Sequence, residues 1–536
     1  MSRPRTPISA FYPLVMALML VVGLFIGHGI GHPERPLPVI FSTRGTSANE
    51  KVGQVLDLID RQYVDPVEKE ALVDEVLQDL LQQLDPHSYY ISAAELRAAQ
   101  EPLEGSFEGI GVEFAIQRDT IVVVAPVEGG PSEALGIRSG DRILQADNVP
   151  LAGVGITNRK VMDNLRGPGG SEVKVTLLRP GRKAPFDVTI TRGKVPITSV
   201  AAAILTPDST GYIKLVRFAR TTHEEFLQAA DDLLSRGMKR LVLDLRGNGG
   251  GYLNSAIDLA DEFLPEGRMI VYTEGRHSPR RDFRSSDRGL LEDMPLAVLI
   301  DEGSASASEI LAGAVQDNDR GLVVGRRTFG KGLVQEHVDL PDQSAVRLTT
   351  ARYYTPSGRS IQRPYGEGID YLADFEDRFL HGELVNKDSV HQDTSEVFTT
   401  LKGRKVYGGG GIMPDIFVAA DTAEGNAYLS ALFFSGVLNQ FAFDVADRER
   451  AALEAFGSSG AFDAGFRVDQ ALLEELKRFA AGQGVREEPS SEALRLAAER
   501  LKAGIARNIW GSSGFYEVLL DDDPIFQRAR SEIGGA

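Results

Sequence analysis

The stretch from Asp301 to Gln335 places the strongest constraint on how this chain folds. It follows an apolar run, Leu296–Ile300, that predicts a buried strand, and it opens with the six small residues Gly303 to Ser308. A helical pattern begins at Glu309, and Ser306 and Glu309 have the S-x-x-E spacing of a capping box. The pattern therefore predicts a strand that turns into a helix, with the Ser306 hydroxyl at the helix N-terminus.

A serine in this position has two interpretations. In the first, it only caps the helix. In the second, it is a nucleophile, because its alanine neighbours leave room for a substrate backbone and the free amides of a helix start can stabilise an oxyanion. A lysine between two glycines, Gly330-Lys331-Gly332, follows a second apolar run at Leu322–Val324 and favours the second interpretation.

Lys331 is the candidate base for this serine. A serine hydroxyl is a weak nucleophile until a base removes its proton, and lysine is a base only when burial lowers its pKa. A shift from ~10.4 to roughly 7–8 corresponds to about 3–4 kcal/mol of desolvation. Gln335 follows in an alternating segment, so a strand would place it on the same face as Lys331. Its neutral amide would orient the amine without restoring the charge.

The segments SASASE and GRRTFGKGLVQ together resemble the signature of the C-terminal processing (tail-specific) proteases, which are serine peptidases with a Ser-Lys dyad. The resemblance covers roughly Ala48 to Asp421. It implies that Ser306 is the nucleophile, Lys331 the general base and Gln335 a supporting residue. It also implies a Clp-protease/crotonase-like α/β peptidase core with an inserted PDZ-like β domain.

A phosphate-binding P-loop is the main competing motif. Gly325 to Lys331 fits G-x-x-x-x-G-K, but the next residue is Gly332 where Mg²⁺ binding needs serine or threonine. The following segment alternates like a strand, whereas a P-loop requires a helix. Nucleotide binding is therefore disfavoured.

The composition of the 536-residue chain excludes several functional classes, and its length predicts three or more domains. A formal charge of −18 argues against nucleic acid as the main partner. The absence of cysteine excludes disulfides, thiolate chemistry and cysteine-ligated zinc. The eight histidines form no H-E-x-x-H motif, and no G-x-S-x-G elbow occurs. The dyad chemistry implied by the resemblance needs no metal, nucleotide or other cofactor.

The N-terminus predicts a membrane anchor within residues 1–34. Arg3 and Arg5 precede a stretch without formal charge from about Ile8 to Ile30, and about 20 residues suffice to cross a bilayer. The basic end predicts a cytoplasmic start and export of everything beyond it. We therefore expect a single pass through the inner (cytoplasmic) membrane, with the catalytic domains in the periplasm. A cleaved signal peptide is the alternative, but GHGIGHPERP offers no convincing A-x-A site.

Residues 35–103 are predicted to be a linker followed by helices. Lys51 to Gln100 shows helical periodicity, broken at Asp65-Pro66 and Asp85-Pro86. This segment is predicted to be a helical cap or a dimerisation segment. Its His87 and Tyr89-Tyr90 are predicted to pack rather than to bind a ligand.

Residues 104–194 combine short strands with one helix at about Asn158–Leu165, and they resemble a PDZ domain in a glycine loop followed by the segment GDRIL. In that family the loop amides hold a peptide C-terminal carboxylate, and the peptide adds as an extra strand. The resemblance implies that the amides of Ile110, Gly111 and Val112 bind the substrate tail. Arg166 either links this domain to the protease core, as in some family members, or is a plain surface arginine.

Residues 195–421 alternate strands and helices, as expected for the α/β peptidase core. Leu241–Leu245 predicts a buried strand that leads into the glycine run Arg246 to Gly251. This run fails the Rossmann fingerprint at Tyr252. The resemblance instead implies an oxyanion strip whose donors are the amides of Gly250 and Ala307. Arg246 is predicted to brace this loop.

Three further segments complete the chain. Tyr353 to Gln362 matches a family segment near the substrate groove, although core packing explains its aromatic residues equally well. Asp370 to Lys405 is a polar insertion. Residues 422–536 are predicted to be a helical C-terminal extension, with patterns at Leu472–Phe479 and Glu492–Ile509. Three roles stay open for it: covering the core, mediating assembly as a homo-oligomer, or binding an adaptor protein.

Together these features predict a multidomain α/β serine endopeptidase of the periplasm. Its PDZ-like domain would bind proteins or peptides with exposed C-termini, and the dyad would hydrolyse their peptide bonds. A proteolytically inactive PDZ scaffold or chaperone that binds protein C-termini is the alternative. A P-loop ATPase is the third hypothesis.

Overall fold

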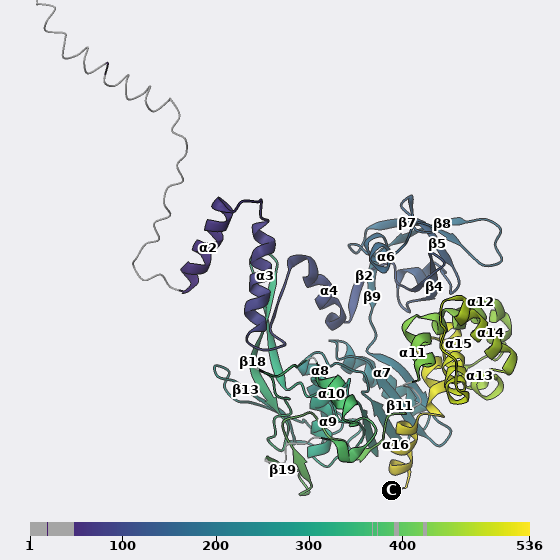
Figure 1. Ribbon diagram of the computed structural model, residues 1–536. Coiled ribbons are helices and arrows are strands. Elements are labelled where there is room, and N and C mark those ends of the chain that lie inside the picture. Colours follow the sequence, from purple (N-terminus) through teal and green to yellow (C-terminus); the bar gives the residue numbers. More distant parts are fainter. Residues whose placement is uncertain are drawn as a thin grey trace, which may run out of the picture. The chain divides into compact units, whose positions relative to one another are not determined.

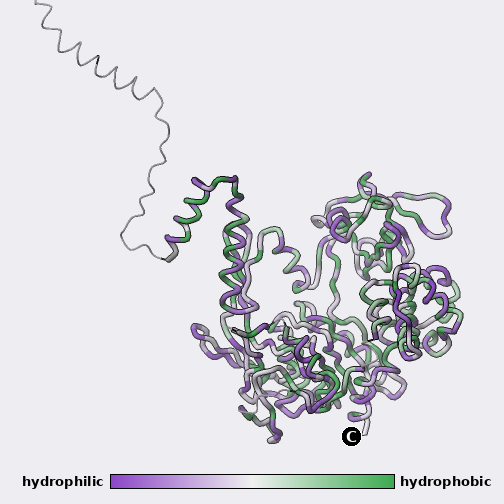
Figure 2. The backbone as a smooth tube through the Cα atoms, in the orientation of Figure 1, coloured by the Kyte–Doolittle hydropathy of each residue, from purple (hydrophilic) through white to green (hydrophobic). Residues whose placement is uncertain are grey.

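The computed structural model describes Met19 and residues 48–366, 368–371, 373–390, 396–421 and 426–535. The chain divides into two compact units, residues 1–75 and 76–536. In the first unit, helix α2 (Ala48–Gln62) alternates hydrophobic and hydrophilic residues along its length (Figure 2). The predicted membrane helix, about Ile8 to Ile30, lies outside the described residues apart from Met19.

The core of the second unit is a six-stranded sheet (Figure 1). Its strands, in spatial order, are β10 (Val200–Leu205), β11 (Thr210–Leu215), β12 (Arg240–Asp244), β15 (Leu296–Ile300), β16 (Leu322–Gly325) and β21 (Ile416–Phe417). All neighbours are parallel except β10 and β11. Continuous apolar runs such as Leu296–Ile300 suit these strands because a parallel sheet is buried on both faces.

Helices cover both faces of this sheet. Alternate residues, such as Leu243 and Val298, pack with helices α7 (Thr222–Ser235), α8 (Leu253–Asp261) and α9 (Ala307–Asp317). The intervening residues, such as Val242 and Leu299, pack against the last helix, α16 (Pro524–Gly534). The C-terminal extension therefore covers the core, which is one of the three roles left open by the sequence.

A second sheet lies beside the core and contains a strand that the sequence pattern did not predict. Its order is β1 (Tyr89–Ile91), β18 (Ala345–Tyr354), β13 (Met269–Glu274) and β14 (Arg281–Arg284), with β17 (Leu333–Asp339) also pairing with β18. The predicted helical segment Lys51–Gln100 is therefore wrong at β1, which separates α3 (Lys69–Gln82) from α4 (Ala93–Glu104). Asp85-Pro86 ends the helical periodicity, and the Tyr-Tyr-Ile sequence favours a strand.

The PDZ-like domain is entered and left through strands β2 (Ser106–Gly109) and β9 (Gly193–Pro196), which pair with each other. Its sheet contains β3 (Val112–Gln117), β4 (Thr120–Pro126), β5 (Arg142–Ala146), β6 (Val149–Pro150), β7 (Glu172–Leu178) and β8 (Phe186–Thr191). Helix α6 spans Asn158–Leu165, as predicted, and a short helix, α5, spans Pro131–Ala134. Strand β3 stands at the end of the sheet, next to β4.

The remaining elements are mostly helical. The polar insertion contains α10 (Asp374–Leu380), the 3₁₀ turn η2 (Lys387–Ser389), β19 (Val397–Thr399) and β20 (Lys405–Tyr407). The extension adds α11 (Ala427–Phe434), α12 (Val437–Glu454), α13 (Ser459–Gly465), α14 (Gln470–Gly482) and α15 (Ser491–Leu520), which share one apolar core. Within α15, Trp510 and Gly511 depart from helical geometry.

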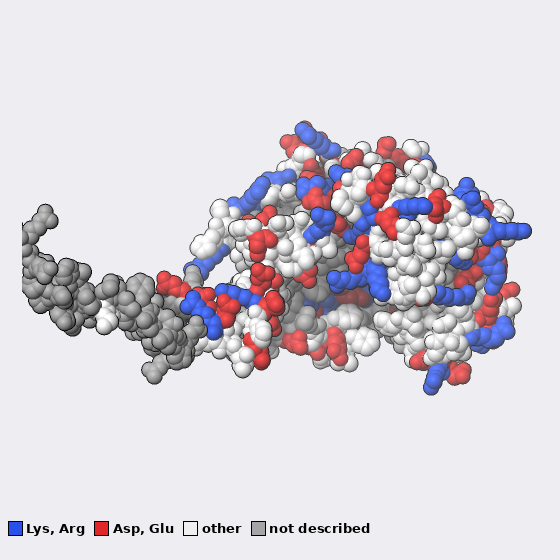
Figure 3. Space-filling model, turned by 90° about the horizontal axis from the view of Figure 1, so that it is seen from above, with Lys and Arg blue, Asp and Glu red and all other residues white. Residues whose placement is uncertain are grey.

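The described part of the chain holds no single helix long and apolar enough to cross a membrane. Helices α11 and α12 meet that test only as a pair, bent by 67°. On the face shown in Figure 3, acidic and basic side chains are interspersed.

Candidate active site

Ser306 occupies a strained turn between β15 and α9. Its φ of 55° and ψ of −113° lie in a region that residues with a Cβ rarely adopt. Such a conformation costs of order 1–3 kcal/mol and occurs most often at functional sites. Helix α9 begins at Ala307, two residues earlier than the predicted start at Glu309, and every residue of the helix is buried.

The buried carboxylate of Glu309 joins the Ser306 turn to the Lys331 loop. Its Oε2 accepts hydrogen bonds of 2.8 Å from the amides of both Ser306 and Lys331. Its Oε1 accepts from the Gly330 amide at 2.7 Å and from the Thr328 hydroxyl at 2.6 Å. Because one oxygen binds both amides, the Ser306 and Lys331 nitrogens lie within about 6 Å of each other.

The Tyr353 hydroxyl makes a second bridge between the same two residues. It donates to the Ser306 carbonyl at 3.1 Å, and it also contacts the Lys331 carbonyl. Tyr353 is fully buried on β18, and burial, with the nearby Glu309 carboxylate, raises its pKa well above the ordinary tyrosine value. The hydroxyl therefore keeps its proton. The structure thus brings the backbones of Ser306 and Lys331, the predicted nucleophile and base, close together from two separate loops.

The surroundings of Lys331 favour its neutral form. Burial lowers the pKa of Lys331 below the ordinary lysine value, and the positive charge of Arg347 lowers it further, against the opposing charges of Glu309 and Asp85. His87 also lies near the amine. Burial, followed by the charge of Lys331, lowers the pKa of His87 to about 4, so this histidine is neutral at physiological pH. Its Nε2 lies 2.9 Å from the Tyr371 hydroxyl, in agreement with the predicted packing role.

Gln335 is placed differently from the expectation of simple alternation. Strand β17 begins at Leu333, after Lys331, and a register shift separates Val334 from Gln335. The alternation of a regular strand therefore does not determine whether Gln335 and Lys331 share a face. The Gln335 Nε2 lies 3.4 Å from the Thr349 hydroxyl, which in turn donates to Asp85 at 3.1 Å. The role of Gln335 stays a prediction.

The glycine run after β12 lies directly against the Ser306 turn. A Cβ placed on Gly250 would lie 2.8 Å from the Ser306 Cβ and 2.9 Å from the Ala307 nitrogen, so only glycine fits. The Asn248 carbonyl accepts from the Ala305 amide at 3.0 Å and from the Ser308 hydroxyl at 2.8 Å. The Gly250 amide itself donates to the Asn248 Oδ1 at 2.9 Å. The glycine run thus lies beside Ser306, where the oxyanion strip was predicted. One of the two predicted donors, the Gly250 amide, is hydrogen-bonded to the Asn248 side chain.

The segment Tyr353–Gln362 braces the site from behind. Beyond the Tyr353 bridge, the Gln362 Oε1 accepts from the Gly332 amide at 2.8 Å. The buried Arg359 donates to Asp317 at 2.8 Å, at the end of α9. The packing interpretation of this segment is therefore confirmed for Tyr353, and its side chains also position the two loops. Its place near a substrate groove stays a prediction.

The PDZ-like domain contains a small apolar pocket, which we call the tail pocket, with a volume of about 160 Å³. The four residues predicted to bind the substrate, Ile110, Gly111, Val112 and Arg166, all line it. The rest of the lining is apolar: Phe107, Phe114, Val161, Met162 and Leu165. Arg166 pairs with Glu101 of α4 and lies 4.5 Å above the ring centre of Phe107. Its ion pair is thus with the helix that precedes the domain and not with residues 195–421.

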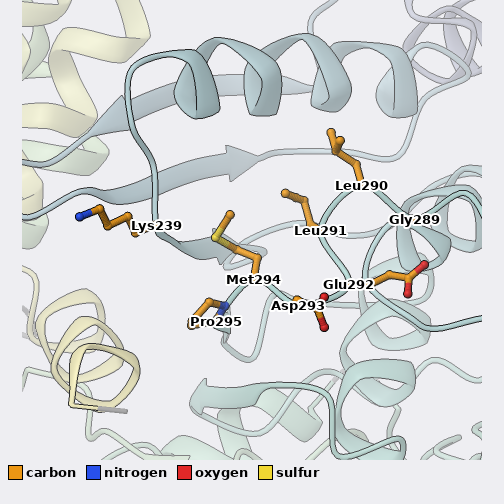
Figure 4. A pocket seen from close by; sticks show the side chains of 8 residues that line it. All are labelled: Lys239, Gly289, Leu290, Leu291, Glu292, Asp293, Met294 and Pro295. Atoms are coloured by element: carbon orange, nitrogen blue, oxygen red, sulfur yellow. The ribbon is translucent and has the colours of Figure 1, made fainter.

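A separate pocket of about 480 Å³ lies in the peptidase core, away from Ser306 (Figure 4). It is lined by Lys239 and residues 289–295, which precede the amino ends of β12 and β15. Ser306 follows the carboxyl end of β15, so the length of a five-residue strand, about 16 Å, separates the two. Figure 4 shows Lys239 and Glu292 on opposite sides of this pocket.

Three family models match successive parts of the chain. Peptidase family S41 matches residues 209–371, the PDZ domain matches 109–190, and a family of unknown function (DUF8443) matches 428–511. The carboxy-terminal-processing protease of Bartonella bacilliformis is 37% identical over 319 residues, which cover 58% of this chain and 72% of that protein. The chain belongs to the carboxy-terminal processing proteases of peptidase family S41.

Other members of the family match over a similar length. The carboxy-terminal processing protease CtpB of Bacillus subtilis is 32% identical over 366 residues, or 66% of this chain and 75% of that protein. A solved photosystem II D1 C-terminal processing protease is 28% identical, with a TM-score of 0.36, and covers 70% of this chain and 94% of its own. Because peptidase family S41 and the PDZ domain both match it, this carboxy-terminal processing protease is a serine peptidase with a PDZ domain, as the motifs predicted. The P-loop hypothesis fails because strand β17, and not a helix, follows Gly332.

Sequence reasoning missed the residues that hold this protease's site together. Glu309 was expected only as a capping partner of Ser306, and Tyr353 only as a packing or groove residue. No sequence spacing connects Asp523, at the start of α16, with Arg246, although the two side chains lie 2.6 Å apart. The S-x-x-E spacing was the one available signal, and it revealed just one of the four hydrogen bonds of the Glu309 carboxylate.

Proposed function

We propose that this protein is a membrane-anchored periplasmic endopeptidase that cleaves proteins with a Ser306–Lys331 dyad. The observation that carries the proposal is the double bridge between the two residues, made by the Glu309 carboxylate and the Tyr353 hydroxyl. These bridges fix the backbone of both residues, and the burial of Lys331 supports a neutral amine.

In the proposed mechanism, the Lys331 amine takes the Ser306 proton as the serine oxygen attacks the peptide carbonyl. The tetrahedral intermediate collapses to an acyl-enzyme when Lys331 returns the proton to the leaving amine. Lys331 then activates water, which hydrolyses the ester and regenerates Ser306. The strained Ser306 backbone stands at the start of α9, where the free helix amides can stabilise the developing oxyanion.

We assign the oxyanion donors to the amides of Ala307 and Gly250. Ala307 is the first residue of α9, where helix amides have no partner within the helix. The Gly250 amide is held by the Asn248 Oδ1, so it reaches an oxyanion by sharing or exchanging that bond. Gln335 is proposed to support Lys331 through the polar chain that leads to Thr349 and Asp85.

We propose that substrates are captured by their C-terminal tails. The tail pocket begins at the amides of Ile110, Gly111 and Val112, and the neighbouring strand β3 has an open edge for an added strand. The apolar lining favours an apolar last residue. The basic, apolar N-terminus of the sequence supports a single inner-membrane anchor with the peptidase in the periplasm.

The decisive experiment compares purified wild type, Ser306→Ala and Lys331→Ala on an unstructured protein substrate. Each variant should lose cleavage by about a thousandfold or more while retaining the wild-type unfolding curve. A serine-reactive probe should label the wild type at Ser306. Ser235→Ala and Lys239→Ala, on the exposed end of α7 and the following turn, are matched controls that should stay active. Undiminished cleavage by either dyad variant would reject the assignment, and a proteolytically silent wild type would favour the PDZ scaffold.

Location is tested separately. Protease added to spheroplasts should digest the C-terminal domains of the full chain, and the remaining fragment should stay with the membrane. If removal of the outer envelope alone released the intact chain, the predicted membrane anchor would be wrong.

A further inference from the structure

The tail pocket continues into a larger groove along strand β3. This second pocket, which we call the upstream groove, has a volume of about 610 Å³, within the range of ligand sites. One wall consists of Glu113 to Gln117 of β3 together with Val124. Phe114 lines both the tail pocket and the upstream groove, so the two adjoin along a strand whose free edge can accept a peptide.

The other wall of the upstream groove comes from the C-terminal extension. It is contributed mainly by helices α12 and α15, including Asn439, Gln440, Phe443, Arg500, Arg507 and Asn508. Specific polar contacts hold this wall on the PDZ-like domain. Arg142 pairs with Asp447 at 3.2 Å, Arg118 pairs with Asp444 at 3.3 Å, and Arg450 donates to the Ser139 hydroxyl at 3.0 Å.

The alternation of β3 determines which tail residues would face these helices. Val112, Phe114 and Ile116 pack against the PDZ core. The intervening Glu113, Ala115 and Gln117 therefore point to the opposite face. They line the upstream groove together with Phe114 and Ile116, so the groove follows the edge of β3. A peptide added to β3 alternates in the same way. Its last and third-from-last side chains face the tail pocket, and its second and fourth-from-last side chains face α12 and α15.

We propose that the C-terminal extension forms the second wall of the tail-binding groove and selects substrates by the outward-facing residues upstream of their carboxylate. The ligand is the extended, unstructured C-terminus of a protein substrate. Arg507 of α15 lines this groove and forms no ion pair with the residues that the structure describes, so it supplies a positive charge on the helix wall, while β3 contributes Glu113. Acidic side chains at the second and fourth positions from the end are therefore preferred. This inference rests on the proposed tail binding by the PDZ-like domain.

The test measures fluorescence anisotropy with the full chain carrying Ser306→Ala, which prevents cleavage. The probes are labelled peptides that end in a free valine and carry either glutamate or lysine at the second and fourth positions from the end. The glutamate peptide should bind about threefold more tightly, as expected for exposed charge pairs. Arg507→Glu should abolish or reverse this preference. Arg478→Glu, an exposed arginine of α14 outside the groove, should leave it unchanged.

Two further measurements distinguish a failure of tail binding from a failure of the role proposed for the C-terminal extension. Amidation of the peptide C-terminus should abolish binding to every variant; unchanged binding of the amidated peptide would reject tail capture itself. The double variant Asn439→Ala/Gln440→Ala changes the same wall without a charge and should weaken the glutamate peptide while its unfolding curve stays that of the parent. Amidation could abolish binding while neither Arg507→Glu nor the double variant alters peptide preference. The C-terminal extension would then not contact the bound tail, and the inference would be wrong.

Discussion

At the residue scale, the site depends on one fully buried carboxylate, that of Glu309, whose two oxygens each accept two hydrogen bonds. Glu309 accepts hydrogen bonds from three backbone amides and one hydroxyl. Burial raises the pKa of Glu309 to about 7, even though these four donors favour the ionised form. A carboxylate is the one side chain of this size that offers only acceptors to so many donors. Its position within α9 makes the catalytic turn and the Lys331 loop a single rigid unit.

Glu309→Gln should disrupt this unit. The glutamine NH₂ group would face amide or hydroxyl donors in place of one carboxylate oxygen, so two hydrogen bonds are lost. We expect a loss of about 1–3 kcal/mol in the free energy of unfolding and at least about a tenfold loss of kcat, because the dyad geometry loosens. Denaturant unfolding and peptide-cleavage kinetics measure the two effects. Glu224→Gln, in the exposed first turn of α7, is the control, and wild-type kcat in Glu309→Gln would contradict the bridging role.

The charge of Arg347 should control the pH range of activity. Lys331 is a base only when neutral, so kcat/KM falls as the pH drops through the pKa of Lys331. Arg347 lowers this pKa, and Arg347→Gln should therefore raise it and move the acidic limb of the profile to higher pH. Activity at neutral pH would fall and recover under more alkaline conditions. Arg281→Gln, on β14 of the same sheet, should leave the profile unchanged; an unshifted limb in Arg347→Gln would show that Arg347 does not act on the amine.

At the element scale, helix α16 is part of the peptidase core although it begins about 190 residues after Gln335 in the sequence. Its N-cap residue, Asp523, binds the amides of Ile525 and Phe526 and also the guanidinium of Arg246. Arg246 in turn binds the buried Asp244 at the end of β12. Burial would raise the pKa of Asp244, but Arg246 and Lys214 outweigh it and hold this pKa below the ordinary value. Arg246 thus braces the glycine strip, as predicted, through a helix that the sequence could not assign to it.

Asp523→Asn should weaken the contact between the start of α16 and the loop that follows β12. Asparagine can still cap α16, but the half-buried ion pair with Arg246 is lost, at a cost of about 1–3 kcal/mol in the free energy of unfolding. Because Arg246 immediately precedes the oxyanion strip, kcat should fall while KM changes little. Asp521→Asn, an exposed neighbour, is the matched control. A variant with reduced stability and unchanged kcat would limit Asp523 to a structural role.

At the scale of the whole molecule, helix α4 connects the tail pocket with the catalytic strip. Its Glu101 pairs with Arg166 of the tail pocket. Its Glu104 pairs with Arg220 at 2.8 Å and accepts from the Tyr252 hydroxyl at 2.8 Å. Tyr252 directly follows the glycine strip. A short helix therefore contacts both the site proposed to bind the tail and the site proposed to cleave the chain.

Glu101→Gln should uncouple these two sites in part. We expect cleavage of a substrate with a free C-terminal tail to fall about two- to fivefold, in line with the small energy of a partly exposed ion pair. Hydrolysis of a short peptide that cannot reach the tail pocket should be unchanged, because the catalytic groups are intact. Parallel kinetics on the two substrates measure the difference. Glu128→Gln, in a loop of the PDZ-like domain, is the control. An equal loss on both substrates would indicate a general effect on the fold.

The sequence by itself determined the family, the order of the domains' motifs and the residue types at Ser306, Lys331 and the glycine strip. Local patterns carry this information, since hydrophobic runs, caps and short motifs depend on neighbours in the chain. Helix α6 and strand β15 were predicted with their observed bounds for this reason.

Only the tertiary structure decided which distant groups hold those motifs in place. Strand β1 forms because β18 offers it an edge, the register shift before Gln335 arises from pairing with β18, and α16 is held by the opposite face of the sheet and by Arg246. The bridge from Tyr353 to Ser306 and Lys331 joins three segments far apart in the chain. Such contacts depend on packing between elements, and no spacing along the sequence encodes them directly.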